Sequence, residues 1–135
     1  MQSRRVSGGL CLKLTRQSSA DRQTIQRYGN GGFKVSGVAF EGSVIVTSSD
    51  TSAWRVTSMT HLTLEDFQPL IALAGSLDVC LLGCGPEMLP LPRVIRTALK
   101  EAGLTVDPMD TGAACRTYNV LMGEGRAVAA ALIAI

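Results

Sequence analysis

The stretch DVCLLGCGPEMLPLP, residues 78–92, decides the fold class of this chain. Val79 to Leu82 form a short, continuous apolar run, which is typical of a strand buried on both faces of a parallel sheet. The Gly-Cys-Gly corner at 83–85 breaks this run, and Pro92 suits the first turn of a following helix. The stretch therefore predicts a buried strand, a tight corner and the start of a helix.

Further strand and helix patterns follow downstream. Gly103 is a natural residue to end the first helix. Leu104 to Val106 predict a strand, and Asp107-Pro108 predicts a turn. A helix over about 112–122 and an apolar, central last strand over 127–134 complete the pattern. The buried stripe of the first helix is expected to consist of Val94, Ile95, Ala98 and Leu99.

The upstream half is richer in strand signals. Paired strands are predicted over Phe33 to Thr47, where apolar and polar residues alternate between turn signals. Residues 48–53 are expected to form a loop, and Trp54 to Val56 a short strand. A helix pattern covers 63–75, in which Pro69 is expected to kink the helix or to delay its start to near Asp66, after a turn.

The order of these elements predicts the fold class. Strand, helix, strand, helix and strand in the C-terminal half imply an α/β fold whose helices cover a largely buried sheet. The N-terminal half adds a small antiparallel β element. Because 135 residues suit one hydrophobic core, we expect a single domain over 25–135, preceded by a flexible N-terminal tail over 1–24.

Composition argues against several classes of function. The formal net charge of +2 is too small for a concentrated nucleic-acid-binding surface, and no apolar run is long enough to span a bilayer. The single histidine, His61, and the spacing of the cysteines do not match a zinc site. We therefore expect no metal, no cofactor, and reduced thiols that act as small core side chains. The cysteines are Cys11, Cys80, Cys84 and Cys115.

The Gly-Cys-Gly corner is the first candidate site. Backbone N–H groups at a glycine corner before a helix can bind an anion, but Met88 stands where a dinucleotide-binding fingerprint has its third glycine. The favoured interpretation is that Gly83 and Gly85 permit a chain reversal that side chains would obstruct. Cys84 is either a thiol activated by the nearby helix start or, as we favour, a buried and unreactive one.

The segment PEMLPLP, residues 86–92, is the second candidate. Loops are normally polar because they face water, so the apolar residues Met88, Leu89 and Leu91 require an explanation. The segment either packs within its own domain or contacts a partner, a role that an adaptable methionine and stiff prolines would suit. The sequence leaves both interpretations open.

The third candidate is DTGAACRTYN, residues 110–119. Asp110 or Thr111 is expected to cap the last helix. Arg116 is suited to hold a carboxylate or phosphate, or to pair with an acid such as Asp110. No serine-histidine-aspartate, paired-carboxylate or metal-binding pattern stands out in the chain.

An ordered set of motifs resembles a known family. It comprises YGNGGFKVSG, GSVIV followed by Trp54, LTLEDF, LLGCGPEMLPLP, GLTVDPMDTGAACRTYNVL and EGRAVAAALIAI. Together these cover nearly everything from about Ile25 to Ile135. The set resembles the mitochondrial respiratory complex I (NADH dehydrogenase) assembly factor 3 family and its small bacterial relatives of unknown function. The resemblance implies a three-layer fold around a central mixed five-stranded sheet in which one strand is antiparallel.

The resemblance also implies a function. It favours a non-catalytic assembly or interaction protein whose partners are membrane-complex subunits or another assembly factor, and it supplies no catalytic residues. We expect no nucleic-acid partner and no membrane span, and homo-oligomerisation stays open. Without a long N-terminal extension the chain resembles the bacterial members, which implies a cytoplasmic location; a eukaryotic source would imply the mitochondrial matrix.

The alternative function is an enzyme or small-ligand-binding protein. Its pocket would lie between the Gly-Cys-Gly corner and the last helix, lined by Cys84, Asp110, Thr111 and Arg116. The candidate ligand- or partner-binding residues for the two hypotheses together are Gly83, Cys84, Gly85, Met88, Leu89, Asp110, Thr111 and Arg116.

Overall fold

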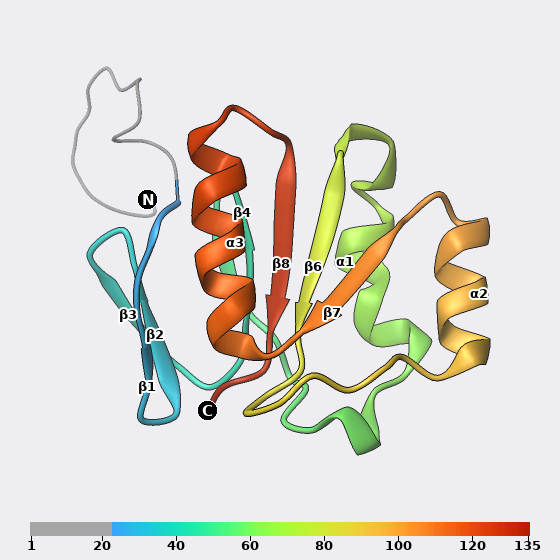
Figure 1. Cartoon of the computed structure of the whole chain (residues 1–135), viewed down its shortest axis with the longest axis horizontal. Coiled ribbons are helices and arrows are strands. Elements are labelled where there is room, and N and C mark those ends of the chain that lie inside the picture. Colours follow the sequence, from blue (N-terminus) through green and yellow to red (C-terminus); the bar gives the residue numbers. More distant parts are fainter. Residues whose placement is uncertain (1–22) are drawn as a thin grey trace, which may run out of the picture.

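Two β-sheets organise the computed structural model, which describes residues 23–135 (Figure 1). Nearly all of the predicted tail over 1–24, and Cys11 with it, lie outside the described residues. The strands are β1 (Ile25–Gly29), β2 (Gly32–Val35), β3 (Val38–Glu41), β4 (Val44–Thr47), β5 (Thr51–Ala53), β6 (Val79–Gly83), β7 (Val106–Met109) and β8 (Val128–Leu132). The helices are α1 (Gln68–Ile71), α2 (Arg93–Glu101) and α3 (Thr111–Gly123), with 3₁₀ turns η2 (Met59–His61), η3 (Leu64–Phe67) and η4 (Ala74–Ser76).

The larger sheet has the strand order β5-β4-β8-β6-β7. β6 runs parallel to both β7 and β8, whereas β4 is antiparallel to both of its neighbours, β5 and β8. One strand of five is therefore antiparallel to the rest, as expected. The apolar segment near the C-terminus forms β8, which lies at the centre of the sheet and is buried along its whole length.

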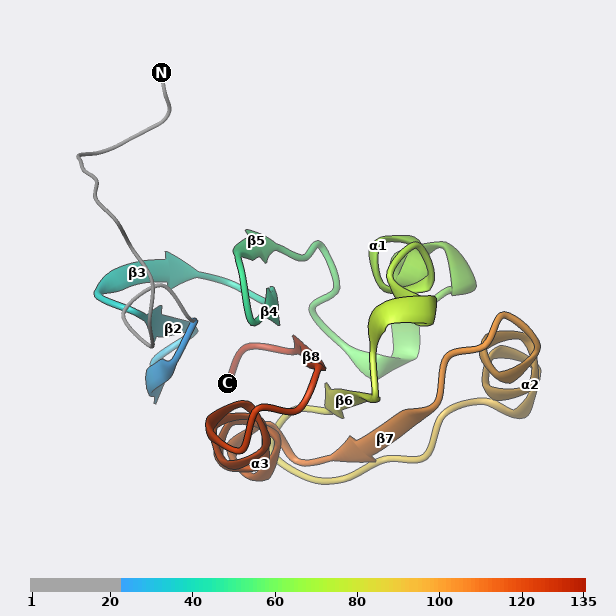
Figure 2. The same ribbon diagram turned by 90° about the horizontal axis from the view of Figure 1, so that it is seen from above.

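The sheet is the middle one of three layers (Figure 2). On one face, α3 and the small β1-β2-β3 sheet enclose a core that includes Tyr118, Val44 and Val128. On the other face, α1, α2 and the segment before them enclose a second core that includes Phe67, Leu99 and Ile45. Successive strand residues point to opposite faces, so both cores draw on the same strands. The predicted α/β fold class is confirmed.

The small N-terminal sheet is an antiparallel meander in which β2 pairs with β1 and β3. It packs on α3 through Ile25, Phe33 and Val35, which are buried in the same core as Tyr118. The predicted small antiparallel β element is confirmed, although its first strand, β1, carried no clear signal in the sequence.

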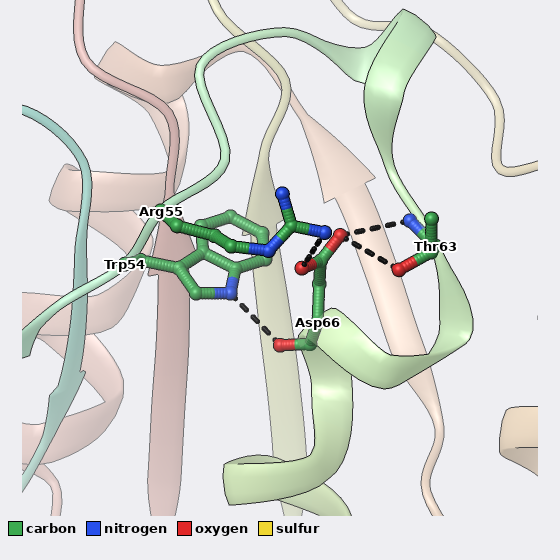
Figure 3. A network of polar contacts seen from close by, with 4 residues as sticks. All are labelled: Trp54, Arg55, Thr63 and Asp66. Carbon is green, nitrogen blue, oxygen red and sulfur yellow. Dashed lines mark hydrogen bonds and ion pairs between the residues drawn. The ribbon is translucent and has the colours of Figure 1, made fainter.

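A buried carboxylate holds the segment after β5 in place (Figure 3). Arg55 Nη2 lies 2.7 Å from Asp66 Oδ1. The backbone N–H and the hydroxyl of Thr63 donate to Asp66 Oδ2 at 2.9 and 3.1 Å. The indole N–H of Trp54 donates to the backbone carbonyl of Asp66 at 2.8 Å, and the Trp54 ring lies edge-on to Phe67. These contacts hold Trp54 and Phe67 in the core beneath α1 and α2.

Two predictions upstream of β6 were wrong in detail. The pattern over 63–75 forms the turn η3, the four-residue helix α1 and the turn η4 instead of one helix. The expected delay of the helix start is confirmed: α1 begins only at Gln68, after the turn η3, and Pro69 stands in its first turn, where its missing N–H costs nothing. The predicted strand at Trp54 to Val56 is absent, and the strand β5 forms at Thr51–Ala53, within the predicted loop, because these residues pair with β4.

Two predictions downstream of β6 were also wrong. Val94 is 81% exposed, so the buried stripe of α2 consists of Ile95 and Leu99, with Ala98 at its margin. Asp107-Pro108 belongs to β7 instead of a turn. β7 is an edge strand, the place in a sheet where a proline without an N–H is tolerated.

Candidate interaction surface

The Gly-Cys-Gly corner and the start of α3 are joined by hydrogen bonds. The N–H of Gly85 donates to the Thr111 hydroxyl, and the N–H of Thr111 donates to the Gly85 carbonyl, both at 2.9 Å. The Thr111 hydroxyl in turn donates to the carbonyl of Ile133 at 2.7 Å. A Cβ at Gly83 would lie only 3.0 Å from Thr111 Cα and from the side chain of Leu132. The structure thus brings together Gly83, Gly85 and Thr111.

This junction lies where ligands often bind in open α/β sheets. The chain leaves β6 toward α2 on one face and leaves the neighbouring strand β7 toward α3 on the other face (Figure 2). Such a change of direction normally leaves a crevice at the carboxyl ends of the strands. Here the N–H of Cys84 donates to the Met109 carbonyl at 2.8 Å, so hydrogen bonds continue across the junction beyond the two strands.

The thiol of Cys84 is buried and points to the face opposite α3. Its side chain belongs to the core beneath α1 and α2, and Sγ donates to the backbone carbonyl of Leu89 at 3.3 Å. Burial raises the pKa of the Cys84 thiol above its ordinary value, which disfavours the thiolate that a nucleophile requires. The contact instead ties the corner to the proline-rich segment that follows.

Asp110 and Arg116 have separate partners at the other side of the junction. Asp110 caps α3, since its Oδ1 accepts the N–H of Ala113 at 2.8 Å. Arg116 Nη1 donates to the hydroxyl of Tyr28 at 2.8 Å. The Tyr28 ring crosses directly over Gly112, because a Cβ there would lie 2.9 Å from the Tyr28 hydroxyl. Sequence reasoning missed Tyr28, which belongs to the unpredicted strand β1.

The connection from β6 to α2 carries exposed apolar side chains. Met88 is 56% and Leu89 is 40% exposed, whereas Leu91 points inward and is only 5% exposed. Val94, in the first turn of α2, adds a further exposed apolar side chain. We call the three exposed residues Met88, Leu89 and Val94 the apolar rim. Val94 was predicted to belong to the buried stripe of α2, and the structure shows it exposed.

Residues 23–135 contain neither a metal-binding cluster nor a membrane-spanning helix. Within residues 23–135, no three His, Cys, Asp or Glu side chains gather closely enough to hold a metal ion. In the same part of the chain, no helix has both the length and the apolar character required to cross a bilayer. Cys80, Cys84 and Cys115 are buried and form no disulfide bonds.

The mixed five-stranded sheet between unequal helical layers, flanked by a three-stranded meander, defines a class of small α/β domain. The chain belongs to the family described as "Protein of unknown function (DUF498/DUF598)", whose model matches residues 25–133. The expected resemblance to complex I assembly factor 3 proteins and to bacterial relatives is confirmed by individual proteins of both kinds.

Three relatives illustrate this membership. An uncharacterized protein of Rhodobacter capsulatus is 35% identical over 109 residues, which cover 81% of this chain and 82% of that protein. Human NADH dehydrogenase [ubiquinone] 1 alpha subcomplex assembly factor 3 is 28% identical over 122 residues, which cover 90% of this chain but only 66% of the human protein. A crystal structure described as an outer membrane protein from Bartonella henselae has a TM-score of 0.78 and 39% identity, and the match covers 87% of this chain and 98% of that one.

Proposed function

We propose that this chain is a non-catalytic interaction protein that takes part in the assembly of a multi-subunit membrane complex of the respiratory type. Two observations support the proposal. The chain is similar over most of its length to a protein whose name describes an assembly factor of NADH dehydrogenase. The candidate nucleophile Cys84 is buried, and its raised pKa disfavours the thiolate.

The apolar rim is the proposed contact surface, and its exposure is the single observation that carries this assignment. Met88 and Leu89 are consecutive, and both face solvent. Burial against a partner would remove their apolar surface from water, which is favourable. Pro86, Pro90 and Pro92 restrict the backbone around them, so little conformational entropy is lost when a partner orders the segment.

Site-specific crosslinking tests this proposal. A photoreactive phenylalanine analogue at position 89 of the full chain is expected to crosslink to subunits of a respiratory complex in membranes of the source organism, identified by mass spectrometry. The matched control places the analogue at Val38, which is apolar and 55% exposed but lies on β3 in the other sheet. Equal capture from both positions, or no reproducible capture of complex subunits from position 89, would overturn the proposal.

A ligand-binding function is the second proposal, and the position of the junction favours it. The ends of β6 and β7 direct their loops to opposite faces, the arrangement at which α/β proteins bind small molecules. In that case a ligand would displace the hydrogen bonds between Gly85 and Thr111. Amide shifts of these two residues in a small-molecule NMR screen would support it, and binding that leaves both amides unshifted would count against it.

A further inference from the structure

A groove lies between α2 and the outer edge of the sheet at β7. Its volume is about 340 Å³, which is in the range of binding pockets in proteins. The apolar lining comes from Leu91, Leu99 and Leu104, each at most 5% exposed, together with Val106 of β7. The polar lining includes Arg96 and Lys100, which are both exposed. The groove is therefore apolar inside with two cations on its α2 side.

Within residues 23–135, the cations of α2 lack ion-pair partners. Arg93, Arg96 and Lys100 recur at helical spacing on the exposed side of α2, and in the described part of the chain none of them forms an ion pair or side-chain hydrogen bond. Glu101 lines a second hollow, beside Arg96 and Lys100, and not the groove itself. Asp107 follows Val106 in β7, and alternation along the strand places its side chain on the opposite face of the sheet.

The edge of β7 restricts what form the occupant takes. Thr105 and Met109 turn their carbonyls toward β6, where they accept N–H groups of Cys80 and Cys84. Alternation then turns the backbone groups of Val106 and Pro108 outward, and Pro108 has no N–H to offer. A β-strand added at this edge would therefore lack one of its backbone hydrogen bonds, at Pro108. The groove instead suits an amphipathic helix, which needs only side-chain contacts.

We propose that this groove binds an acidic, amphipathic helix of a partner protein. Apolar side chains of that helix pack on the floor that Leu91, Leu99 and Leu104 form, and its carboxylates face Arg96 and Lys100. Charge complementarity selects this occupant, because a basic segment would meet like charges at the rim. The inference rests on the proposed function as an interaction protein and adds the charge and the secondary structure of the partner segment.

A pair of designed peptides tests the proposal on the full chain. One is a helical peptide with leucines at positions i, i+3, i+4 and i+7 and glutamates beside them, and the other has lysines in place of the glutamates. We expect the glutamate peptide to shift the amide NMR signals of residues 91–106 and to bind about 10-fold more tightly than the lysine peptide. Raising the salt concentration is expected to reduce this preference.

Charge-reversed variants supply the matched comparison. R96E/K100E is expected to weaken binding of the glutamate peptide about 10-fold and to improve binding of the lysine peptide. The control R27E/K34E changes the net charge equally, on two exposed residues of the other sheet, and is expected to leave both affinities unchanged. Equal effects of the two variants, equal binding of the two peptides, or amide shifts outside the groove would overturn the proposal.

Two further outcomes separate this inference from the proposed function. If R96E/K100E still crosslinks to complex subunits from position 89 as efficiently as the unmodified chain, the interaction function stands and the groove proposal falls. If the chain binds phosphatidylglycerol vesicles through Arg96 and Lys100 but binds neither peptide, the groove faces anionic lipid and the helix proposal is wrong. If position 89 crosslinks to no complex subunit while the glutamate peptide binds at the groove, the proposed assembly function fails alone.

Discussion

Thr111 and Gly85 are joined by two hydrogen bonds that run in opposite directions. The Gly85 N–H donates to the Thr111 hydroxyl and the Thr111 N–H donates to the Gly85 carbonyl, each at 2.9 Å. Thr111 is completely buried, so these bonds are protected from competition by water. They connect the ends of two neighbouring parallel strands at the point where the chain departs to opposite faces of the sheet.

Replacing Thr111 with valine is expected to lower the free energy of unfolding by about 1–3 kcal/mol, because the buried Gly85 N–H and Ile133 carbonyl lose their partner. Thr111→Ser keeps the hydroxyl and should cost less. Urea denaturation followed by circular dichroism measures both variants. A valine variant as stable as the serine variant would show that these hydrogen bonds contribute little.

Gly83→Ala is expected to destabilise the fold by about 1–3 kcal/mol through overpacking, since the added Cβ would lie 3.0 Å from the backbone of Thr111. Gly75→Ala is the matched control, because a Cβ at Gly75 meets no atom within 4 Å. Thermal unfolding compares the two variants. If the control were destabilised as much as Gly83→Ala, the close approach would not be the cause.

The contacts of Asp66 predict that its own replacement costs more stability than replacement of its partner Arg55. Asp66→Ala removes a buried carboxylate that accepts from Thr63 and is expected to cost about 1–3 kcal/mol. Arg55→Ala is expected to cost less than about 1 kcal/mol, because the Arg55 side chain is 66% exposed and water screens its charge. Urea denaturation at neutral pH measures the free energy of unfolding of both variants. A larger loss for Arg55→Ala than for Asp66→Ala would contradict the central role of Asp66 in these contacts.

Alkaline pH is expected to destabilise the protein through buried thiols. Burial raises the pKa of Cys80 from 9.0 to about 12. The native state then keeps a proton that the unfolded chain releases above pH 9.0, so the free energy of unfolding falls as pH rises from 9.0 toward 12, by about 1.4 kcal/mol per unit for one thiol. Below this window the contribution is fully present.

Denaturation at a series of pH values across that window measures the slope. Cys80→Ala is expected to show a shallower decline than the unmodified chain. It should keep the part due to Cys115, whose pKa burial also raises to about 12. Parallel pH profiles for the two proteins would show that Cys80 ionises as readily in the native state as in the unfolded chain.

The C-terminal half of the fold was predictable because its signals are local. The apolar run before the corner at 83–85 and the run that forms β8 are each typical of a strand buried on both faces, and both form such strands. Asp110, predicted as one of two caps, does cap α3. Gly103 adopts a positive φ of 86° just after α2, as a helix-ending glycine does.

The remaining features depend on contacts between segments that are far apart in the sequence, and no local pattern predicts such contacts. Residues 51–53 become a strand only because β4 lies beside them. Pro108 is accepted in β7 because one edge of that strand faces no other strand. The contact between Tyr28 and Arg116 joins residues 88 positions apart, and nothing near either of them in the sequence signals it.

The composition of β8 has a consequence for how this family can vary. Ala129 and Ala131 face the core beneath α1, and Ala130 faces the core beneath α3, all of them completely buried. The three consecutive alanines keep the flanking layers close to the backbone of the sheet at the middle of β8, and so fix the spacing between the layers there. Homologues with larger residues here would need smaller ones on the helices opposite, and such exchanges should therefore occur in compensating pairs.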